Sequence, residues 1–268
     1  MSEPRIIVEK ANAVAKVTIN RPEKHNAMDL QFFREFGPRI DELSQDAEVR
    51  VIILTGAGRS FCSGIDLVGL AEVARDSASA TVLGQSLSEP FGPLQSVPRS
   101  LRACRKPVIA AVNGFASGMG MSLLCLCDYR IASEQASFAP GFIRMGLAGE
   151  FGITYILPRL IGFPFALKFL SEGETRDARW AERVGLVEEV VPAGDLMEAA
   201  QRLAAKLATM PPIALGMVKE LLYQGLESNF DYQLQSEAYA ASILLRTEDF
   251  QEAVRAFLEK RPPVFKGR

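Results

Sequence analysis

Two apolar runs that each end in a glycine-containing turn restrict what this chain can fold into. The first spans 49–54, interrupted only by one arginine, and enters the turn 55–58. The second spans 107–112 and enters Asn-Gly at 113–114, and an apolar stretch at 118–127 follows it. Apolar runs of this length are typical of strands that are buried on both faces. Strand, glycine turn and helix occurring twice in this order predict an α/β core with covered sheets.

The segments around these runs extend the α/β pattern. Alternating apolar and polar residues at 15–19 predict a half-buried strand. Asp29 precedes an apolar-periodic stretch and is expected to cap a helix that continues to about residue 46. A helical region is expected over 68–102, and its Ser-, Gly- and Pro-rich part at 84–100 is interpreted as a mobile loop.

The C-terminal third reads as helical. After Pro192, Asp195 is expected to cap a helix that ends before Pro211-Pro212, and three more helices are predicted at 213–224, 230–245 and 248–259. We therefore divide the chain into an α/β core at 1–192 and a helical region at 193–268, which we expect to dock on a neighbouring subunit or to close a site.

Charge and residue counts exclude several classes of function. The formal net charge of 268 residues is −2, with no block of like charges, so no nucleic-acid partner is expected. The cysteines at 62, 104, 125 and 127 form no Cys-x-x-Cys pair and lie far in sequence from His25, the lone histidine. No metal site is therefore expected, and reduced, packed thiols are the better interpretation. Without a signal pattern or a membrane-length apolar run, the expected location is the cytoplasm, with no membrane partner.

One acidic residue stands alone in an apolar stretch. Between Gln135 and Ser171 the sequence carries a single acid, Glu150, whose neighbours are apolar or glycine. Burying an unpaired carboxylate raises its pKa, and such a group can transfer protons at neutral pH. The alternative is a surface loop in which the glycines leave Glu150 facing water, as most acids do.

Three segments, taken together, resemble the crotonase family, the enoyl-CoA hydratase/isomerase superfamily. They are Thr-Gly-Ala-Gly-Arg-Ser-Phe-Cys-Ser-Gly-Ile-Asp-Leu at 55–67, Lys-Pro-Val-Ile-Ala-Ala-Val-Asn-Gly-Phe-Ala-Ser-Gly-Met-Gly at 106–120, and Arg-Met-Gly-Leu-Ala-Gly-Glu at 144–150 with Leu-Pro-Arg-Leu-Ile-Gly at 157–162. The resemblance extends over nearly the whole chain.

The resemblance implies a fold and a substrate class. The fold is a spiral of ββα units followed by a C-terminal helical trimerisation region, with trimers often paired into hexamers. The substrate is an acyl-CoA thioester, so that CoA is part of the substrate and no separate cofactor is expected. By position, the backbone N–H groups of Ile65 and Met119 would form an oxyanion hole for a thioester enolate, a device whose donors are each worth about a hundred- to thousandfold in rate.

The resemblance also identifies what is missing. Hydratases of this family hold a water between two glutamates, and the corresponding positions here are Ser122 and Phe142. Glu150 stands where Δ3,Δ2-enoyl-CoA isomerases of this family carry their single glutamate. A 1,3-proton shift needs only one carboxylate, whereas adding water needs an acid and a base. Glu150, Ile65 and Met119 are therefore predicted to be catalytic, in an enoyl-CoA isomerase.

Other residues are expected to contact the substrate. Asp66 reads as a structural acid that holds its turn, and Asp128 as a structural acid at a helix end. Lys24 and the Ala27 backbone match positions that contact the nucleotide end of CoA, and Lys260 is a weaker candidate across a subunit boundary. The full set of expected substrate contacts is Lys24, Ala27, Cys62, Gly64, Ile65, Asp66, Leu67, Gly118, Met119, Phe142 and Lys260.

Three other functions stay open at this point. Glu150 could attack an acyl or ring carbon, or orient water, in a hydrolase or dehalogenase. A hydratase-type lyase would need a residue outside the usual places. A non-catalytic binding relative, for instance one that binds RNA, is disfavoured because helix 29–46 mixes basic and acidic residues.

Overall fold

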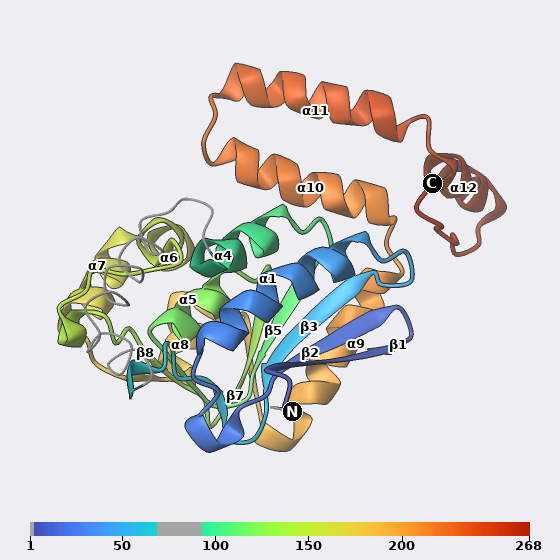
Figure 1. Cartoon of the computed structure of the whole chain (residues 1–268). Coiled ribbons are helices and arrows are strands. Elements are labelled where there is room, and N and C mark those ends of the chain that lie inside the picture. Colours follow the sequence, from blue (N-terminus) through green and yellow to red (C-terminus); the bar gives the residue numbers. More distant parts are fainter. Residues whose placement is uncertain (1–2, 69–92) are drawn as a thin grey trace.

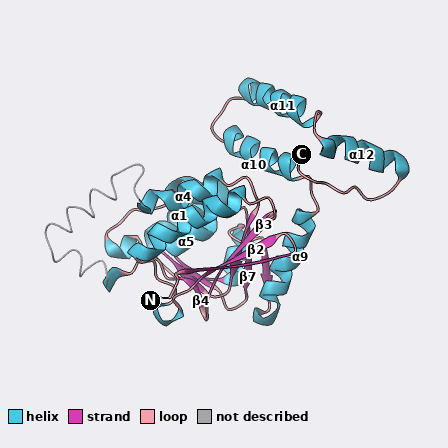
Figure 2. Cartoon of the chain, turned by 45° about the vertical axis from the view of Figure 1, so that its right-hand side comes forward, coloured by secondary structure: helices cyan, strands magenta, loops and turns pink. Residues whose placement is uncertain are grey.

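The computed structural model describes residues 3–68 and 93–268. An α/β body carries the N-terminus, and an arm of three C-terminal helices projects from it (Figures 1 and 2). The predicted α/β class is confirmed.

The larger sheet has six strands in the order β1-β2-β3-β5-β7-β10. Strands β1 and β2 are antiparallel, and every other neighbouring pair is parallel. The strands are β1 (Ile6–Ala11), β2 (Val14–Ile19), β3 (Val51–Gly56), β5 (Val108–Val112), β7 (Tyr129–Ser133) and β10 (Glu189–Val191).

The smaller sheet positions the candidate site. Its order is β4-β6-β8-β9, with β4 (Ser60–Cys62), β6 (Phe115–Ser117) and β8 (Ser137–Ala139) parallel to one another. The last strand, β9 (Arg176–Asp177), pairs antiparallel with β8. Because β4 follows β3 and β6 follows β5, each unit passes from the larger sheet to the smaller one.

Helices cover both faces of the larger sheet, because the central strands bury side chains on alternating faces. On one face, Ile52 and Leu54 of β3 pack with α1 (Leu30–Gln45), α4 (Pro93–Ala103) and α5 (Met119–Cys125). On the other face, Val51 and Ile53 pack with α9 (Leu196–Ala208), which lies across the strands from α1 (Figure 2). α9 thus follows the division expected at residue 192 but packs on the body.

The other body helices among the described residues are α6 (Ile153–Ile161), α7 (Phe163–Glu172) and α8 (Ala178–Val184). Short 3₁₀ turns lie at η1 (Pro22–Lys24), η2 (Ile143–Met145) and η3 (Ala193–Asp195), and η3 leads into α9.

The expectation of a loop over 84–100 is wrong for its last residues. Residues 93–100 belong to α4, and the rest of that segment lies outside the described residues. α4 forms because Leu94, Val97 and Leu101 recur at helical spacing and are buried against the body. Pro98 lies inside the helix without ending it.

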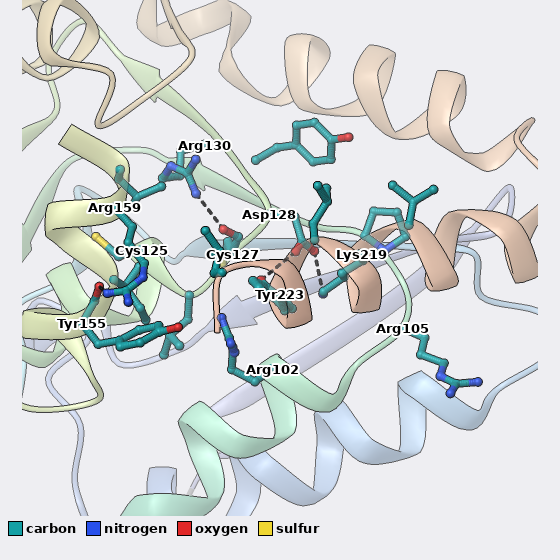
Figure 3. Close-up of a pocket in the computed structure, with 18 of the residues that line it drawn as sticks. Arg102, Arg105, Cys125, Cys127, Asp128, Arg130, Tyr155, Arg159, Lys219 and Tyr223 are labelled. Carbon is teal, nitrogen blue, oxygen red and sulfur yellow. Dashed lines mark hydrogen bonds and ion pairs between the residues drawn. The ribbon is translucent and has the colours of Figure 1, made fainter. Parts of the chain in front are cut away.

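The arm consists of α10 (Pro212–Gly225), α11 (Phe230–Leu244) and α12 (Glu248–Glu259). Several polar contacts attach it to the body, among them those of Asp128, whose carboxylate accepts hydrogen bonds from Lys219 Nζ at 2.7 Å and from the Tyr223 hydroxyl at 3.2 Å (Figure 3). Much of the arm's apolar surface is exposed, including Val218, Leu222, Leu226, Phe230, Tyr239, Phe257 and Leu258.

Candidate active site

Three turns meet at one edge of the smaller sheet because their strands run parallel. β4, β6 and β8 are neighbours, so the segments that follow them leave the sheet on the same side. The first turn carries Ile65, the second carries Met119, and the third carries Phe142. The structure thus brings together three residues that are far apart in sequence.

Two glycines allow the first two turns to approach closely. A Cβ on Gly120 would lie 2.1 Å from the Cys62 carbonyl oxygen, and one on Gly64 would lie 2.9 Å from the Ser117 carbonyl oxygen. Gly64 also has φ +94°, which side-chain-bearing residues rarely adopt. Any larger residue at either position would push the two turns apart.

The backbone around Ile65 directs its N–H away from the neighbouring chain. The Gly64 carbonyl accepts a hydrogen bond from Met28 N at 2.8 Å, and Asp66 N donates to the Met28 carbonyl at 2.9 Å. In a trans peptide the C=O and N–H point in opposite directions. Because the Gly64 carbonyl points at Met28, the Ile65 N–H points the other way, and it donates to no acceptor among the described residues.

The start of α5 directs the Met119 N–H in the same manner. The Gly118 carbonyl accepts from Ser122 N at 3.0 Å as the first helical bond, so the N–H of the same peptide points out of the helix start. Gly118 is the N-cap, and no described side chain caps this end. Two unpaired N–H groups on adjacent turns are what an oxyanion hole requires.

Glu150 lies in the connection between η2 and α6, and partial burial raises the pKa of its carboxyl group above the usual glutamate value. Its carboxylate has no hydrogen-bond or ion-pair partner within the described part of the chain. The next residue, Phe151, has φ +56° and packs edge-on against Phe33 of α1, with ring centroids 6.4 Å apart. Glu150 is therefore half-buried, although residues 143–148, in η2 and the same connection, are exposed.

The two positions that carry glutamates in hydratases hold no carboxylate. Ser122 is fully buried on α5, and its hydroxyl donates back to the Gly118 carbonyl at 3.4 Å. Phe142 is buried, with its side chain in the apolar core. Neither residue can supply a base at neutral pH.

The predicted substrate contacts fall into two groups. Lys24 and Ala27 lie beside the first turn, since Ser63 Oγ donates to the Lys24 carbonyl at 3.4 Å and Ser63 N donates to the carbonyl of His25. Leu67 is half-exposed at the same turn. Lys260 instead follows α12 as its C-cap, and α12 lies on the projecting arm, apart from α5 and β8 of the body (Figure 1).

The two acids expected to be structural have the contacts of structural groups. Asp66 Oδ2 accepts from Arg21 Nη1 at 2.7 Å, and Asp128 Oδ2 accepts from Val108 N at 2.8 Å in addition to its arm contacts. The thiol of Cys62 donates to the Asn26 carbonyl, and burial raises its pKa to about 12. It is a packing group and not a nucleophile.

Sequence reasoning missed the residues that hold the first turn. Asn26 is fully buried and its Nδ2 donates to the carbonyls of Ala57 and Ser60, while Met28 bridges Gly64 and Asp66. An asparagine in a polar turn gives no local sign of burial. Only knowledge of the fold, which brings Asn26 within hydrogen-bonding distance of the turn after β3, would have identified it.

A cavity of about 350 Å³ lies elsewhere, between α10 and the body (Figure 3). Its charged lining includes Arg102, whose guanidinium lies 3.7 Å from the centre of the Tyr223 ring, and Asp128, whose oxygens already accept three hydrogen bonds. It holds no free carboxylate and none of the three turns lines it.

Within residues 3–68 and 93–268, no group of three or more His, Cys, Asp or Glu side chains is arranged to hold a metal ion. Among the helices of the same residues, none is long and apolar enough to cross a membrane.

Known proteins are similar to this chain over nearly its whole length. A family model described as enoyl-CoA hydratase/isomerase matches residues 9–268. A short-chain-enoyl-CoA hydratase of Clostridium acetobutylicum is 38% identical, with 96% of this chain and 95% of that protein covered. A 1,2-epoxyphenylacetyl-CoA isomerase of Escherichia coli is 35% identical, with 97% of each covered. The crystal structure of an enoyl-CoA hydratase from Bacillus anthracis superimposes with a TM-score of 0.89 at 33% identity, over 98% of this chain and all of that one.

Proposed function

The chain belongs to the enoyl-CoA hydratase/isomerase family, and within it we propose that the protein is an enoyl-CoA isomerase in which Glu150 is the single acid–base group. The observation that carries the proposal is that Glu150 is half-buried with a raised pKa, whereas both hydratase positions, Ser122 and Phe142, lack a carboxylate. The substrate class is an acyl-CoA thioester with a double bond between C3 and C4.

The first step is removal of a proton from C2 by the Glu150 carboxylate. The electron pair of the broken C–H bond moves toward the thioester oxygen, and the resulting enolate accepts hydrogen bonds from the N–H groups of Ile65 and Met119. These donors are held by the backbone before substrate arrives, so they need no rearrangement when charge develops.

The second step returns the proton from Glu150 to C4. The double bond moves to C2–C3, the thioester carbonyl re-forms, and the carboxylate is regenerated, so the product has the same atoms as the substrate. Glu150 must be ionised to take the proton from C2 and protonated to deliver it to C4. A carboxyl pKa raised toward neutrality suits both steps.

Hydration is the second candidate, because several relatives, including that of Clostridium acetobutylicum, are named as hydratases. Against it stand Ser122 and Phe142, which offer no second acid–base group to activate the water. The similar protein of Escherichia coli that is named as an isomerase shows that likeness of this degree is not confined to hydratases.

The test is turnover of 3-enoyl-CoA by Glu150→Gln. The variant keeps the size of the side chain but cannot take a proton, so we expect turnover to fall by about a thousandfold or more, at the upper end of what a positioned acid–base group contributes. Glu134→Gln, at an exposed turn of the body, is the matched control and should keep wild-type turnover. Full activity of Glu150→Gln with intact fold and CoA binding would reject the proposal.

We also infer that the protein is a homo-oligomer, a trimer or hexamer, in which the exposed apolar side chains of the arm are covered. Phe257 and Leu258 are 82% and 74% exposed in the protomer, and such exposure on one arm is typical of an assembly surface. Light scattering coupled to size-exclusion chromatography measures the mass directly, and a monomer at micromolar concentration would contradict the inference.

A further inference from the structure

Residues 21–29, which we call the strap, supply the backbone hydrogen bonds that hold the turn carrying Ile65. The strap follows β2, contains η1 and ends at the residue before α1. Met28 hydrogen-bonds to both residues that flank Ile65, and Ser63 N donates to the His25 carbonyl at 3.0 Å. The position of the Ile65 N–H therefore depends on where the strap lies.

An ion pair closes the far side of this contact. Arg21 Nη1 lies 2.7 Å from Asp66 Oδ2, and the two side chains are only 14% and 15% exposed. The same guanidinium nitrogen also donates to the Ala27 carbonyl at 3.3 Å, so Arg21 connects the end of β2, the middle of the strap and the residue after Ile65. Charge-assisted hydrogen bonds that are shielded from water are stronger than neutral ones.

The consequences for Ile65 follow from the chain itself. Gly64 precedes it in a conformation of positive φ that glycine leaves easily, so the N-terminal side of the turn supplies little stiffness of its own. Asp66 follows it, and its side chain is fixed by Arg21. We propose that Arg21, through Asp66, is a positioning residue that holds the Ile65 N–H at the place where the oxyanion forms.

This inference rests on the proposed function for the reaction that Arg21 would accelerate. The hydrogen bonding to the thioester oxygen can be measured whether or not the enzyme is an isomerase. Carboxylates of Asp66, Asp29 and Glu23 lie within 3.8 Å of the guanidinium and offset its charge, so Arg21 acts on the position of the donor and not by its own field. Its loss should therefore weaken hydrogen bonding to the thioester oxygen in the bound complex, and slow catalysis, while leaving recognition of the CoA portion largely in place.

A spectroscopic experiment separates positioning from general stability. A conjugated aromatic acyl-CoA bound to Glu150→Gln should show a red shift in its absorption, because donors at the thioester oxygen polarise the chromophore. Arg21→Met in the same Glu150→Gln background should reduce that shift, with the dissociation constant of the ligand changed by less than about threefold, since uniform binding energy is not what is lost.

Kinetics of the otherwise wild-type enzyme provide the second measurement. Arg21→Met should lower kcat by about tenfold to a hundredfold with KM little changed, and Arg21→Lys should recover part of the loss because it restores the charge but not the second hydrogen bond. Asp66→Asn, which retains a side-chain oxygen, should act like Arg21→Met, and the double variant should be no worse than either alone. Arg39→Met is the control, since Arg39 pairs with Glu42 on the exposed side of α1.

The outcomes distinguish the positioning role of Arg21 from the proposed isomerase function. An unchanged red shift and unchanged kcat in folded Arg21→Met and Asp66→Asn would overturn the positioning role, as would additive losses in the double variant. If the wild-type enzyme does not isomerise 3-enoyl-CoA but Arg21→Met still reduces the red shift, the positioning role stands and the proposed function fails.

Discussion

Gly120→Ala adds a single methyl group and should disturb the geometry of the proposed oxyanion hole. A Cβ at this position would lie 2.1 Å from the Cys62 carbonyl oxygen and 2.8 Å from the Cys62 carbonyl carbon and Cβ. Side-chain carbons in real structures stay at least 3.0 Å away. The start of α5 and the end of β4 must therefore separate by about 1 Å.

This separation should move the two proposed oxyanion donors, the N–H groups of Ile65 and Met119, apart. Met119 precedes Gly120, and Cys62 lies just before the turn that carries Ile65, so the gap between the two N–H groups widens. A misplacement of about 1 Å can cost about a hundredfold in rate, and we expect kcat on 3-enoyl-CoA to fall by about that factor. Overpacking should cost about 1–3 kcal/mol of folding free energy, offset in part by about 1 kcal/mol because alanine favours a helix over glycine. The variant is therefore expected to fold.

The assay is steady-state isomerisation together with thermal unfolding by circular dichroism. Gly194→Ala is the matched control, because a Cβ on Gly194 would meet no atom within 4 Å and the backbone there is compatible with alanine. It should match the wild type in both measurements. If Gly120→Ala retained kcat within about threefold of wild type while its melting temperature fell, the close approach of the turns would concern stability and not catalysis, and the argument from the two glycine turns would be refuted.

Three further predictions follow from burial and charge. Because burial raises the pKa of Glu150, folding favours its protonated form, so the stability contributed is present below the unfolded pKa and lost as pH rises through the folded pKa. Glu150→Gln should therefore melt at a higher temperature than wild type at pH 7 but not at pH 4, and the acid limb of the wild-type kcat profile should lie above the ordinary glutamate pKa; an equal melting temperature at pH 7 would contradict this. Cys62 and Cys125, whose pKa values burial raises to about 12, should react with a thiol reagent at pH 8 only after unfolding, and rapid native-state labelling of either, mapped by mass spectrometry, would be inconsistent with the packing. Asp128→Ala should lower the free energy of unfolding in urea by about 3 kcal/mol because it leaves Lys219 without its partner, whereas Glu198→Ala in the exposed pair with Arg202 should change it by less than about 1 kcal/mol; similar effects would show that the arm junction is not a buried pair.

Local sequence patterns predict the elements of this fold where one physical cause dominates. The apolar runs at 49–54 and 107–112 supply most of β3 and β5, because strands that are apolar on both faces are stable only between two covering layers. Asp29 caps α1 as expected, accepting from Phe32 N at 2.9 Å. Asp195 stands at the start of α9, but its side chain accepts no capping hydrogen bond.

The failure at α4 has a physical explanation. The Ser-, Gly- and Pro-rich composition of 84–100 suggested a loop, yet Leu94, Val97 and Leu101 supply an apolar face whose burial outweighs the weak helix propensity of the residues between them. Tertiary packing decided the structure there, and the helical spacing of those three residues was the signal that composition concealed.

The candidate site likewise contains residues that the sequence could identify and residues that only the fold could. Ile65 and Met119 could be proposed from the sequence only by position, through the resemblance to the crotonase family, and the same resemblance gave a role to Glu150, which local sequence marks only as an isolated acid. Met28, Asn26 and the pairing of Arg21 with Asp66 could not, since their partners lie 31 to 45 residues away and nothing in the local pattern names them. Phe151, which has φ +56° and packs against Phe33, likewise shows nothing in its local sequence that would predict this conformation.

The most direct test of the central claim is the mass of the first product formed from 3-enoyl-CoA in water enriched in oxygen-18. A mechanism with Glu150 as its single acid–base group predicts a conjugated product with the same mass as the substrate and no incorporated label. A first product heavier by one labelled water would contradict it.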